Sequence, residues 1–234
     1  MLRAGALHLL GEDERALKEI RRSRRVFPSD ILLMRVEAVI LGALGRETDI
    51  HRLEQEVNAT PGYGTVLTDI AAEQFLRGDT VSGRATARKA IDWFRRQPAA
   101  DSVGNSGQMF FARLLGGTPA ELEVYVKFDC DSLAIDCWRQ RGTAAALRGD
   151  TTMARAAVLT IQRMTLTPRL RQADASIALA QIFAALGDDD RATTYLRDSF
   201  SKGTPKGLVV RLLFAPFPKL QAHENFRELM RPKG

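Results

Sequence analysis

A glycine recurs along this 234-residue chain at nearly constant intervals, each time one or two residues after a leucine. The intervals between successive members are 34, 33, 38, 33 and 38 residues. A unit of about 34 residues holds two helices and buries its apolar face only by stacking on a neighbour. The spacing therefore predicts a row of helical hairpins. The glycines are Gly11, Gly45, Gly78, Gly116, Gly149 and Gly187.

The residues around each glycine suit the corner of a hairpin. We expect the glycine to end the first helix in the left-handed conformation. An acid follows it in four units, where it can cap the second helix: Glu12, Asp79, Asp150 and Asp188. A small residue stands seven positions before it, where the two helices must approach closely: Ala4, Ala38, Ala71, Gly142 and Ala180, with Met109 as the exception. Alanine stands five positions after it in three units: Ala16, Ala154 and Ala192.

Composition agrees with a helical chain, because alanine, leucine and arginine dominate and β-branched runs are few. Apolar spacing and helix stops predict first helices at about 2–10, 30–44, 63–77, 103–115, 133–148 and 170–186. The second helices are expected at about 13–26, 48–58, 80–96, 119–128, 151–164 and 189–201.

The sixth unit carries the fullest pattern: Leu179, Ala180 and Phe183, then Gly187, then Ala192 and Leu196. The fifth unit has Trp138, Gly142, Gly149 and Ala154 at corresponding places. This pattern resembles the tetratricopeptide repeat family, from the start of the chain to about residue 203. The resemblance implies an all-α fold, an α-α superhelix (solenoid) of about six hairpins with a C-terminal capping helix.

The expected organisation is one solenoid domain over residues 1–234. Its repeats cover about 1–28, 29–61, 62–98, 99–130, 131–168 and 169–203, with a cap at 204–234. In the cap, Leu220, Phe226, Leu229 and Met230 can fold back over the last hairpin. This ending is similar to that of bacterial tetratricopeptide regions that follow a kinase, a cyclase or a winged-helix regulator. It suggests a fragment of a longer protein, and hence the sensor or regulatory half of a signalling or transcription regulator.

The leading expectation for function is a non-catalytic scaffold that binds a protein or peptide in a concave groove. In the family that the chain resembles, the first helices line this groove. An arginine-rich groove suits an extended peptide or an acidic partner. The alternative is that Phe75 and Phe110 belong to the core and the arginines are only solvated. The candidate partner-binding residues are Arg35, Thr68, Phe75, Phe110, Arg113, Asp136, Arg139 and Gln181.

Two basic clusters suggest a second alternative, nucleic-acid binding on the convex face. One cluster contains Arg21, Arg22, Arg24 and Arg25, and the other runs from Arg84 to Arg96. Ile20, Ser23 and Phe27 are expected to form the buried face of the first of these helices, so that its arginines splay outwards. The net charge of +6 is modest for this length, so a solvated face is the preferred interpretation and nucleic acid an unlikely partner.

Other classes of site find no support in the sequence. The three histidines lie in different units, and no nucleophile, phosphate-loop or zinc-protease motif occurs, so we expect no enzyme, cofactor or metal. Cys130 and Cys137 are too few for a zinc site and are expected to be free, small and buried in a reducing compartment. No apolar run is long enough to span a bilayer, so a cytoplasmic location without membrane contact is the default expectation.

Overall fold

The computed structural model describes residues 2–58, 60, 62–97, 106–127, 130, 134–164, 169–205 and 207–231. The described residues are helical throughout their regular structure and divide into two compact units. Unit 1 is Met1–Gly117 with Gly207–Pro216, and unit 2 is Thr118–Lys206 with Phe217–Lys233.

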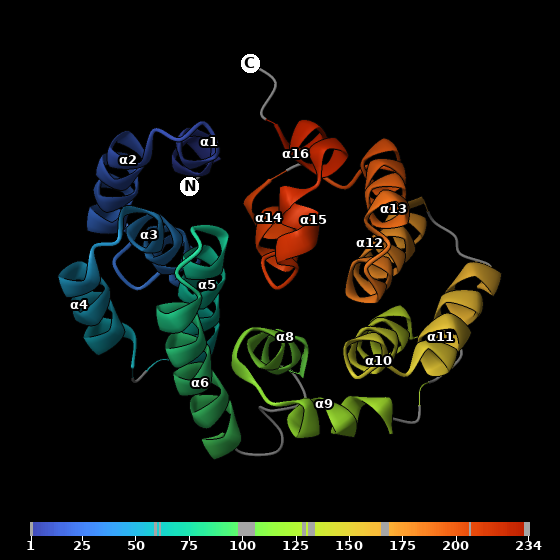
Figure 1. The fold of residues 1–234 in the computed structure, drawn as a ribbon. Helices are drawn as coiled ribbons and strands as arrows, with labels where there is room; N and C mark the ends of the chain where they lie inside the picture. The colour runs from blue at the N-terminus through green and yellow to red at the C-terminus, as the bar shows by residue number, and fades with distance from the viewer. Residues whose placement is uncertain are drawn as a thin grey trace. The chain divides into compact units, whose positions relative to one another are not determined.

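Unit 1 consists of packed helix pairs and one segment from late in the chain (Figure 1). Its helices are α1 (Leu2–Leu9), α2 (Asp13–Val26), α3 (Ile31–Leu44), α4 (Glu47–Val57), α5 (Tyr63–Leu76), α6 (Thr80–Arg96), α8 (Ser106–Gly116) and α14 (Leu208–Leu213). Helices α1 and α2, α3 and α4, and α5 and α6 pack as hairpins. The first helices α1, α3, α5 and α8 also pack on one another in chain order.

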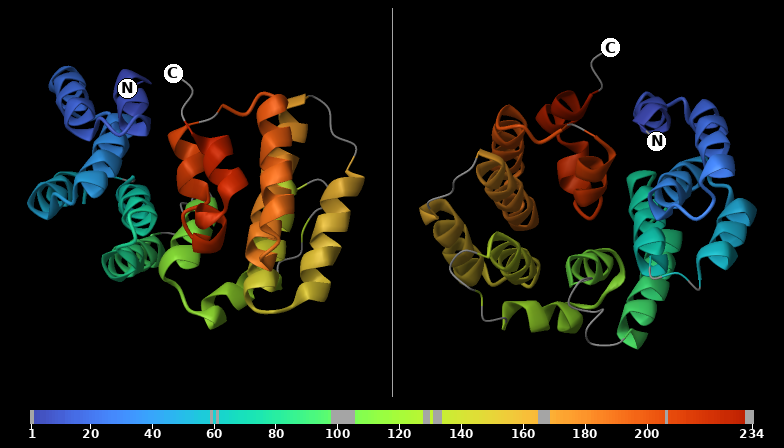
Figure 2. Two further views of the ribbon diagram at one scale, coloured as in Figure 1. Left: turned by 45° about the horizontal axis from the view of Figure 1, so that its top comes forward. Right: turned by 180° about the vertical axis from the view of Figure 1, so that it is seen from behind.

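Unit 2 also contains packed helical hairpins. Its helices are α9 (Pro119–Val126), α10 (Ile135–Leu147), α11 (Thr151–Arg163), α12 (Arg169–Leu186), α13 (Asp189–Ser201), α15 (Pro218–Ala222) and α16 (Glu224–Met230). Helices α10 and α11, and α12 and α13, form packed hairpins, and α10 packs on α12. The orange pair α12 and α13 runs side by side in both views of Figure 2.

The helix predictions are confirmed over the described residues, each close to its expected bounds, whereas the predicted ends at 103, 128 and 133 lie outside the described residues. The corner glycines are also confirmed in five units, where φ is positive: Gly11, Gly45, Gly78, Gly149 and Gly187. Three of the four following acids cap the next helix, since Asp79, Asp150 and Asp188 accept hydrogen bonds from the backbone N–H groups of Ser82, Met153 and Arg191. Glu12 is different, because its side chain pairs with Arg15 and caps nothing.

Gly116 does not end its helix in the left-handed conformation, so that prediction is wrong. It is the last helical residue of α8, and a Cβ there would lie 2.7 Å from the Cβ of Ala87 and 2.9 Å from the carbonyl oxygen of Arg84. Both neighbours belong to α6. Glycine at this position therefore allows α8 and α6 to approach closely.

The fourth predicted hairpin is divided between the units. Helix α8 packs on α5 and α6 in unit 1, whereas α9 packs on α10 in unit 2. The fourth unit also departs from the repeat pattern in sequence, because Met109 and Glu121 stand at the positions where small residues are expected. That the two units make up one continuous solenoid domain stays a prediction.

The C-terminal residues are also divided. Helices α15 and α16 pack on α13, and Leu220 and Phe226 are buried, as expected of a cap on the last hairpin. Helix α14 instead packs on α5 of unit 1, although it was predicted within the cap at 204–234. Its Leu212 is buried against α3, α5 and α8, which draws the helix to that unit.

The two cysteines form a disulfide, which the sequence did not predict. Cys130 and Cys137 lie with their Cα atoms 5.6 Å apart, and both are half-buried rather than buried. The seven-residue spacing brings them together because Cys130 stands before α10 and Cys137 lies in its first turn. None of the helices in the described part of the chain combines the length and the apolar character needed to cross a membrane.

Candidate functional site

The groove residues predicted in unit 1 are mostly covered. Thr68 and Phe110 are fully buried, and the Thr68 hydroxyl donates to the Gly64 carbonyl within α5. Phe75 is half-buried against an apolar cluster, and Arg113 is half-buried.

Arg35 lies in α3, where its Nε is 2.7 Å from Asp69 Oδ2 in α5. Asp69 is buried, and burial raises its pKa against the opposing effect of Arg35. This pair links two first helices.

In unit 2 the structure brings three of the predicted groove residues together. Arg139 Nε lies 3.1 Å from Asp136 Oδ1 and Nη1 lies 2.8 Å from Gln181 Oε1. Gln181 is fully buried, whereas the Asp136 side chain is largely exposed. The Arg139 side chain thus reaches from the solvent edge of α10 to the interior of α12. A partner-binding role for these residues stays a prediction.

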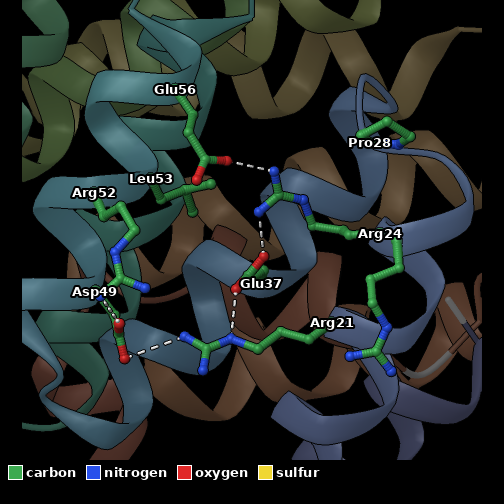
Figure 3. A pocket seen from close by; sticks show the side chains of 9 residues that line it. Arg21, Arg24, Pro28, Glu37, Asp49, Arg52, Leu53 and Glu56 are labelled. Carbon is green, nitrogen blue, oxygen red and sulfur yellow. Dashed lines mark hydrogen bonds and ion pairs between the residues drawn. The ribbon is translucent and has the colours of Figure 1, made fainter.

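A second, more open site lies between α2, α3 and α4. It is a pocket of about 430 Å³ that we name the arginine pocket. Helix α2 and the turn after it supply four of its residues, and α3 and α4 supply the rest (Figure 3). Its lining residues are Arg21, Arg24, Arg25, Pro28, Glu37, Asp49, Arg52, Leu53 and Glu56.

Glu37 is the centre of the ion pairs in this pocket. It is 4% exposed and comes from α3, between the two arginines of α2 that it pairs with. Arg21 Nε lies 3.0 Å from Glu37 Oε1, and Arg24 Nη1 lies 2.5 Å from Glu37 Oε2. Each arginine then reaches α4, with Arg21 on Asp49 at 3.1 Å and Arg24 on Glu56 at 2.6 Å. Figure 3 shows both guanidinium groups turned toward Glu37.

These contacts hold the two arginines firmly charged. Burial lowers the pKa of Arg21, but its hydrogen bonds to Glu37 and Asp49 outweigh burial and raise the pKa. For Arg24, burial is again the largest single effect, and the hydrogen bonds to Glu56 and Glu37 raise the pKa in the same way. The Arg24 Nε is buried without a hydrogen-bond partner among the described residues.

The expectation that the arginines of α2 all splay into solvent is therefore wrong for Arg21 and Arg24. They turn inwards because Glu37 offers a buried carboxylate on the neighbouring helix. Ile20 is fully buried as predicted, but Phe27 is 61% exposed and not part of a buried face. Phe27 follows the last residue of α2, where the helical periodicity no longer applies.

Arg25 differs from the other arginines of the pocket. Among the described residues it has no carboxylate partner, and it is exposed. The pocket contains four arginines and three carboxylates, so one positive charge is left unbalanced. Two exposed apolar residues follow Arg25 directly in the chain, Val26 at 67% and Phe27 at 61% exposed. The positively charged Arg25 is thus followed by two exposed apolar side chains.

Unit 1 also holds a buried polar cluster beneath α14. His8 Nδ1 lies 2.6 Å from Asp13 Oδ1, and its Nε2 lies 3.4 Å from Arg211 Nη1 and 3.8 Å from Glu73 Oε2. Arg211 Nη2 donates to Glu73 Oε1 at 3.2 Å. His8 is 2% and Glu73 is 1% exposed. These distances suit a neutral histidine that donates from Nδ1 to Asp13 and accepts at Nε2 from Arg211.

Burial dominates the electrostatics of this cluster. It raises the pKa of Glu73 to about 7, although Arg211 and Arg77 oppose it. It lowers the pKa of His8 below its ordinary value, against the hydrogen bond to Asp13. The carboxyl and the imidazole therefore both favour their neutral forms more than they do in water.

Sequence reasoning missed Glu37 and Glu73, on which both clusters depend. The signal is a single acid inside an apolar stretch of a first helix, as in Met34-Arg-Val-Glu-Ala-Val-Ile40 and Ile70-Ala-Ala-Glu-Gln-Phe75. An acid at such a position needs a cationic partner, because an unpaired buried charge is unfavourable. The identity of each partner depends on which helices pack there.

No family model, no curated protein and no solved structure matches this chain.

Proposed function

We propose that the chain is a non-catalytic helical-repeat scaffold of tetratricopeptide type, and that its arginine pocket binds an acidic segment of a protein partner. The observation that carries the proposal is the unbalanced positive charge of the pocket beside two exposed apolar residues. Stacked hairpins support it, because such scaffolds present a preformed surface that loses little conformational entropy on binding.

The pocket suits a carboxylate ligand in both charge and geometry. Guanidinium groups bind carboxylates through two parallel hydrogen bonds, and the ion pairs with Glu37 and Asp49 hold Arg21 in place in advance. Arg25 supplies a cation without a competing partner in the described structure. A carboxylate of the partner would contact Arg25 first.

Val26 and Phe27 supply the apolar part of the interface. Both are more than half exposed in the structure, and aromatic side chains are frequent anchors in protein interfaces. We therefore expect a partner segment in which acids stand next to a leucine or an aromatic residue.

Nucleic acid is a weaker candidate for this surface. A phosphate backbone favours a continuous field of arginine and lysine, but Glu37, Asp49 and Glu56 neutralise most of the positive charge here. The second basic cluster is also partly paired, with Lys89 on Glu54 and Arg95 on Asp92. A protein segment that brings one or two acids fits this charge balance better.

Fluorescence anisotropy at low salt tests the proposal with three probes. They are a fluorescein-labelled peptide Ser-Glu-Asp-Leu-Glu-Phe-Asp-Ser, the same peptide with lysine at each acid, and a 12-nucleotide single-stranded DNA. We expect the acidic peptide to bind most tightly, and Arg25→Glu to weaken it about tenfold, as expected for loss and reversal of one close charge pair.

Arg155→Glu is the matched control, because Arg155 is exposed on α11 of unit 2. It should change the affinity for the acidic peptide less than about twofold. Equal losses in the two variants would assign the binding to net charge alone. Preferential binding of the DNA, lost in Arg25→Glu, would move the function to nucleic acid.

A further inference from the structure

Helix α14 covers the first helices of unit 1. The segment Gly207–Pro216 belongs to that unit, although residues 118–206 precede it in the chain. Leu212 and Ala215 are buried in one apolar cluster with residues of α3, α5, α6 and α8. The members contributed by these four helices are Val39, Ala71, Ala72, Ala87, Phe111 and Leu115.

Arg211 adds a charged contact to this apolar one. Its Nη2 lies 3.2 Å from Glu73 Oε1 and its Nη1 lies 3.4 Å from His8 Nε2. Glu73 Oε2 is buried and has no hydrogen-bond partner among the described residues. The apolar surface beneath α14 thus adjoins the polar cluster around His8, in which the buried Glu73 carboxylate has capacity for more donors than Arg211 supplies.

Glycine residues precede α14 and proline residues follow it, and they separate it from the neighbouring helices. Gly203 has a φ of 114°, and Gly207 precedes the helix in an extended conformation. Pro216 lies between the end of α14 and the start of α15 at Pro218, and it prevents the two helices from joining. A helix of six residues is not stable alone, so α14 owes its structure to the surface that it covers.

We propose that the face of α3, α5 and α8 beneath α14 is a docking groove for a short apolar helix of a protein partner that carries an arginine, and that α14 occupies this groove in the free chain. The occupant in the structure defines the chemistry: leucine and alanine on the apolar floor and a guanidinium on Glu73. A partner helix with the same pattern competes with α14.

Two features of α14 govern this competition, one in favour of the partner helix and one against it. Helix α14 is only six residues long, so a longer partner helix has more apolar surface to bury. Attachment of α14 to the same chain gives it a high effective concentration, which lowers the apparent affinity of any partner until α14 is released. The groove is distinct from the arginine pocket, whose lining comes from α2, the turn after it, α3 and α4.

The test uses a fluorescein-labelled peptide with the sequence of residues 207–217, Gly-Leu-Val-Val-Arg-Leu-Leu-Phe-Ala-Pro-Phe. Its affinity is measured for the full-length wild type and for a full-length Leu212→Glu variant, in which the helix in cis is loosened. We expect the variant to bind the peptide at least about tenfold more tightly, because the competitor has been removed. A second peptide, with glutamine in place of its arginine, should lose most of this affinity.

Two further variants keep the test decisive. Arg211→Gln removes only the charge from α14 and should raise the affinity for the arginine peptide several-fold even if Leu212→Glu is unstable. Leu159→Glu places the same change at an exposed leucine on α11 and should leave the affinity as in the wild type. Equal binding of the peptide by wild type and Arg211→Gln, or equal binding of the two peptides, would overturn the proposal.

Discussion

Arg211 Nη2 lies 3.2 Å from Glu73 Oε1, although the two residues are 138 positions apart in the chain. This contact joins α14 to α5 and closes the buried cluster around His8. Because Glu73 is buried, its protonation state is tied to the stability of unit 1.

The first prediction concerns the pH dependence that Glu73 produces. Burial raises its pKa from 4.5 to about 7, so the folded state binds a proton that the unfolded state has already lost. Its contribution to stability is complete below about pH 4.5 and is lost as the pH rises to about 7. Between these limits the free energy of unfolding of the wild type should fall, relative to Glu73→Gln, by up to about 3 kcal/mol.

Urea unfolding of both proteins from pH 4.5 to 8 measures this difference. His8 acts in the opposite sense, because its lowered pKa gives a contribution that is present above pH 6.5 and lost in acid. In a His8→Gln variant, the fall in the free energy of unfolding that Glu73 causes should therefore appear without the opposing contribution of His8. Parallel pH profiles for wild type and Glu73→Gln would contradict the prediction.

The second prediction concerns the buried carboxylate of the arginine pocket. Glu37→Gln leaves Arg21 and Arg24 without their shared partner and should lower the free energy of unfolding by about 2 kcal/mol. Glu56→Gln removes a carboxylate whose side chain is 44% exposed and should lower it by less than about 1 kcal/mol. Thermal unfolding at pH 7 compares the two. A larger loss in Glu56→Gln would mean that Glu37 does not organise the pocket.

The third prediction concerns the corner glycines. Gly187 has a φ of 76° and open space where a Cβ would lie, so Gly187→Ala isolates the backbone effect. It should lower the free energy of unfolding by about 1 kcal/mol. Gly107→Ala is the control, because Gly107 lies in α8 with the same open space and an ordinary φ. That variant should be as stable as the wild type or slightly more stable, by at most about 1 kcal/mol.

The fourth prediction concerns the disulfide of unit 2. Cys130 and Cys137 are seven residues apart, and a loop of this size restricts the unfolded chain by about 2 kcal/mol in the chain-entropy treatment. Reduction with dithiothreitol should lower the free energy of unfolding by about that amount. A Cys130→Ser/Cys137→Ser double variant should match the reduced protein and not respond to dithiothreitol. A wild type that is indifferent to the reductant would show that the bond is not formed. A disulfide persists most readily in an oxidising environment, whereas the sequence predicted free cysteines in a reducing compartment. The cytoplasmic location stays a prediction.

Much of the local structure was predictable from the sequence, for a physical reason. Helix starts and stops depend on residues within one turn, such as Gly149 with its positive φ and Asp150 with its capping carboxylate. The small residues at close helix approaches, Ala38 and Ala180 among them, are likewise fully buried as expected. Periodicity and capping act over a few residues, so they can be interpreted without a structure.

The sequence by itself thus determined that the described part of this protein is helical, with defined helix ends and small residues where helices cross. Only the tertiary structure decided where α14 lies, that Arg21 and Arg24 turn inwards to Glu37, and that Arg211 meets Glu73. An arginine in a helical sequence has the same local preference whether it is solvated or paired. Its partner is selected by the burial of a carboxylate on another helix, which depends on how residues far apart in the chain pack.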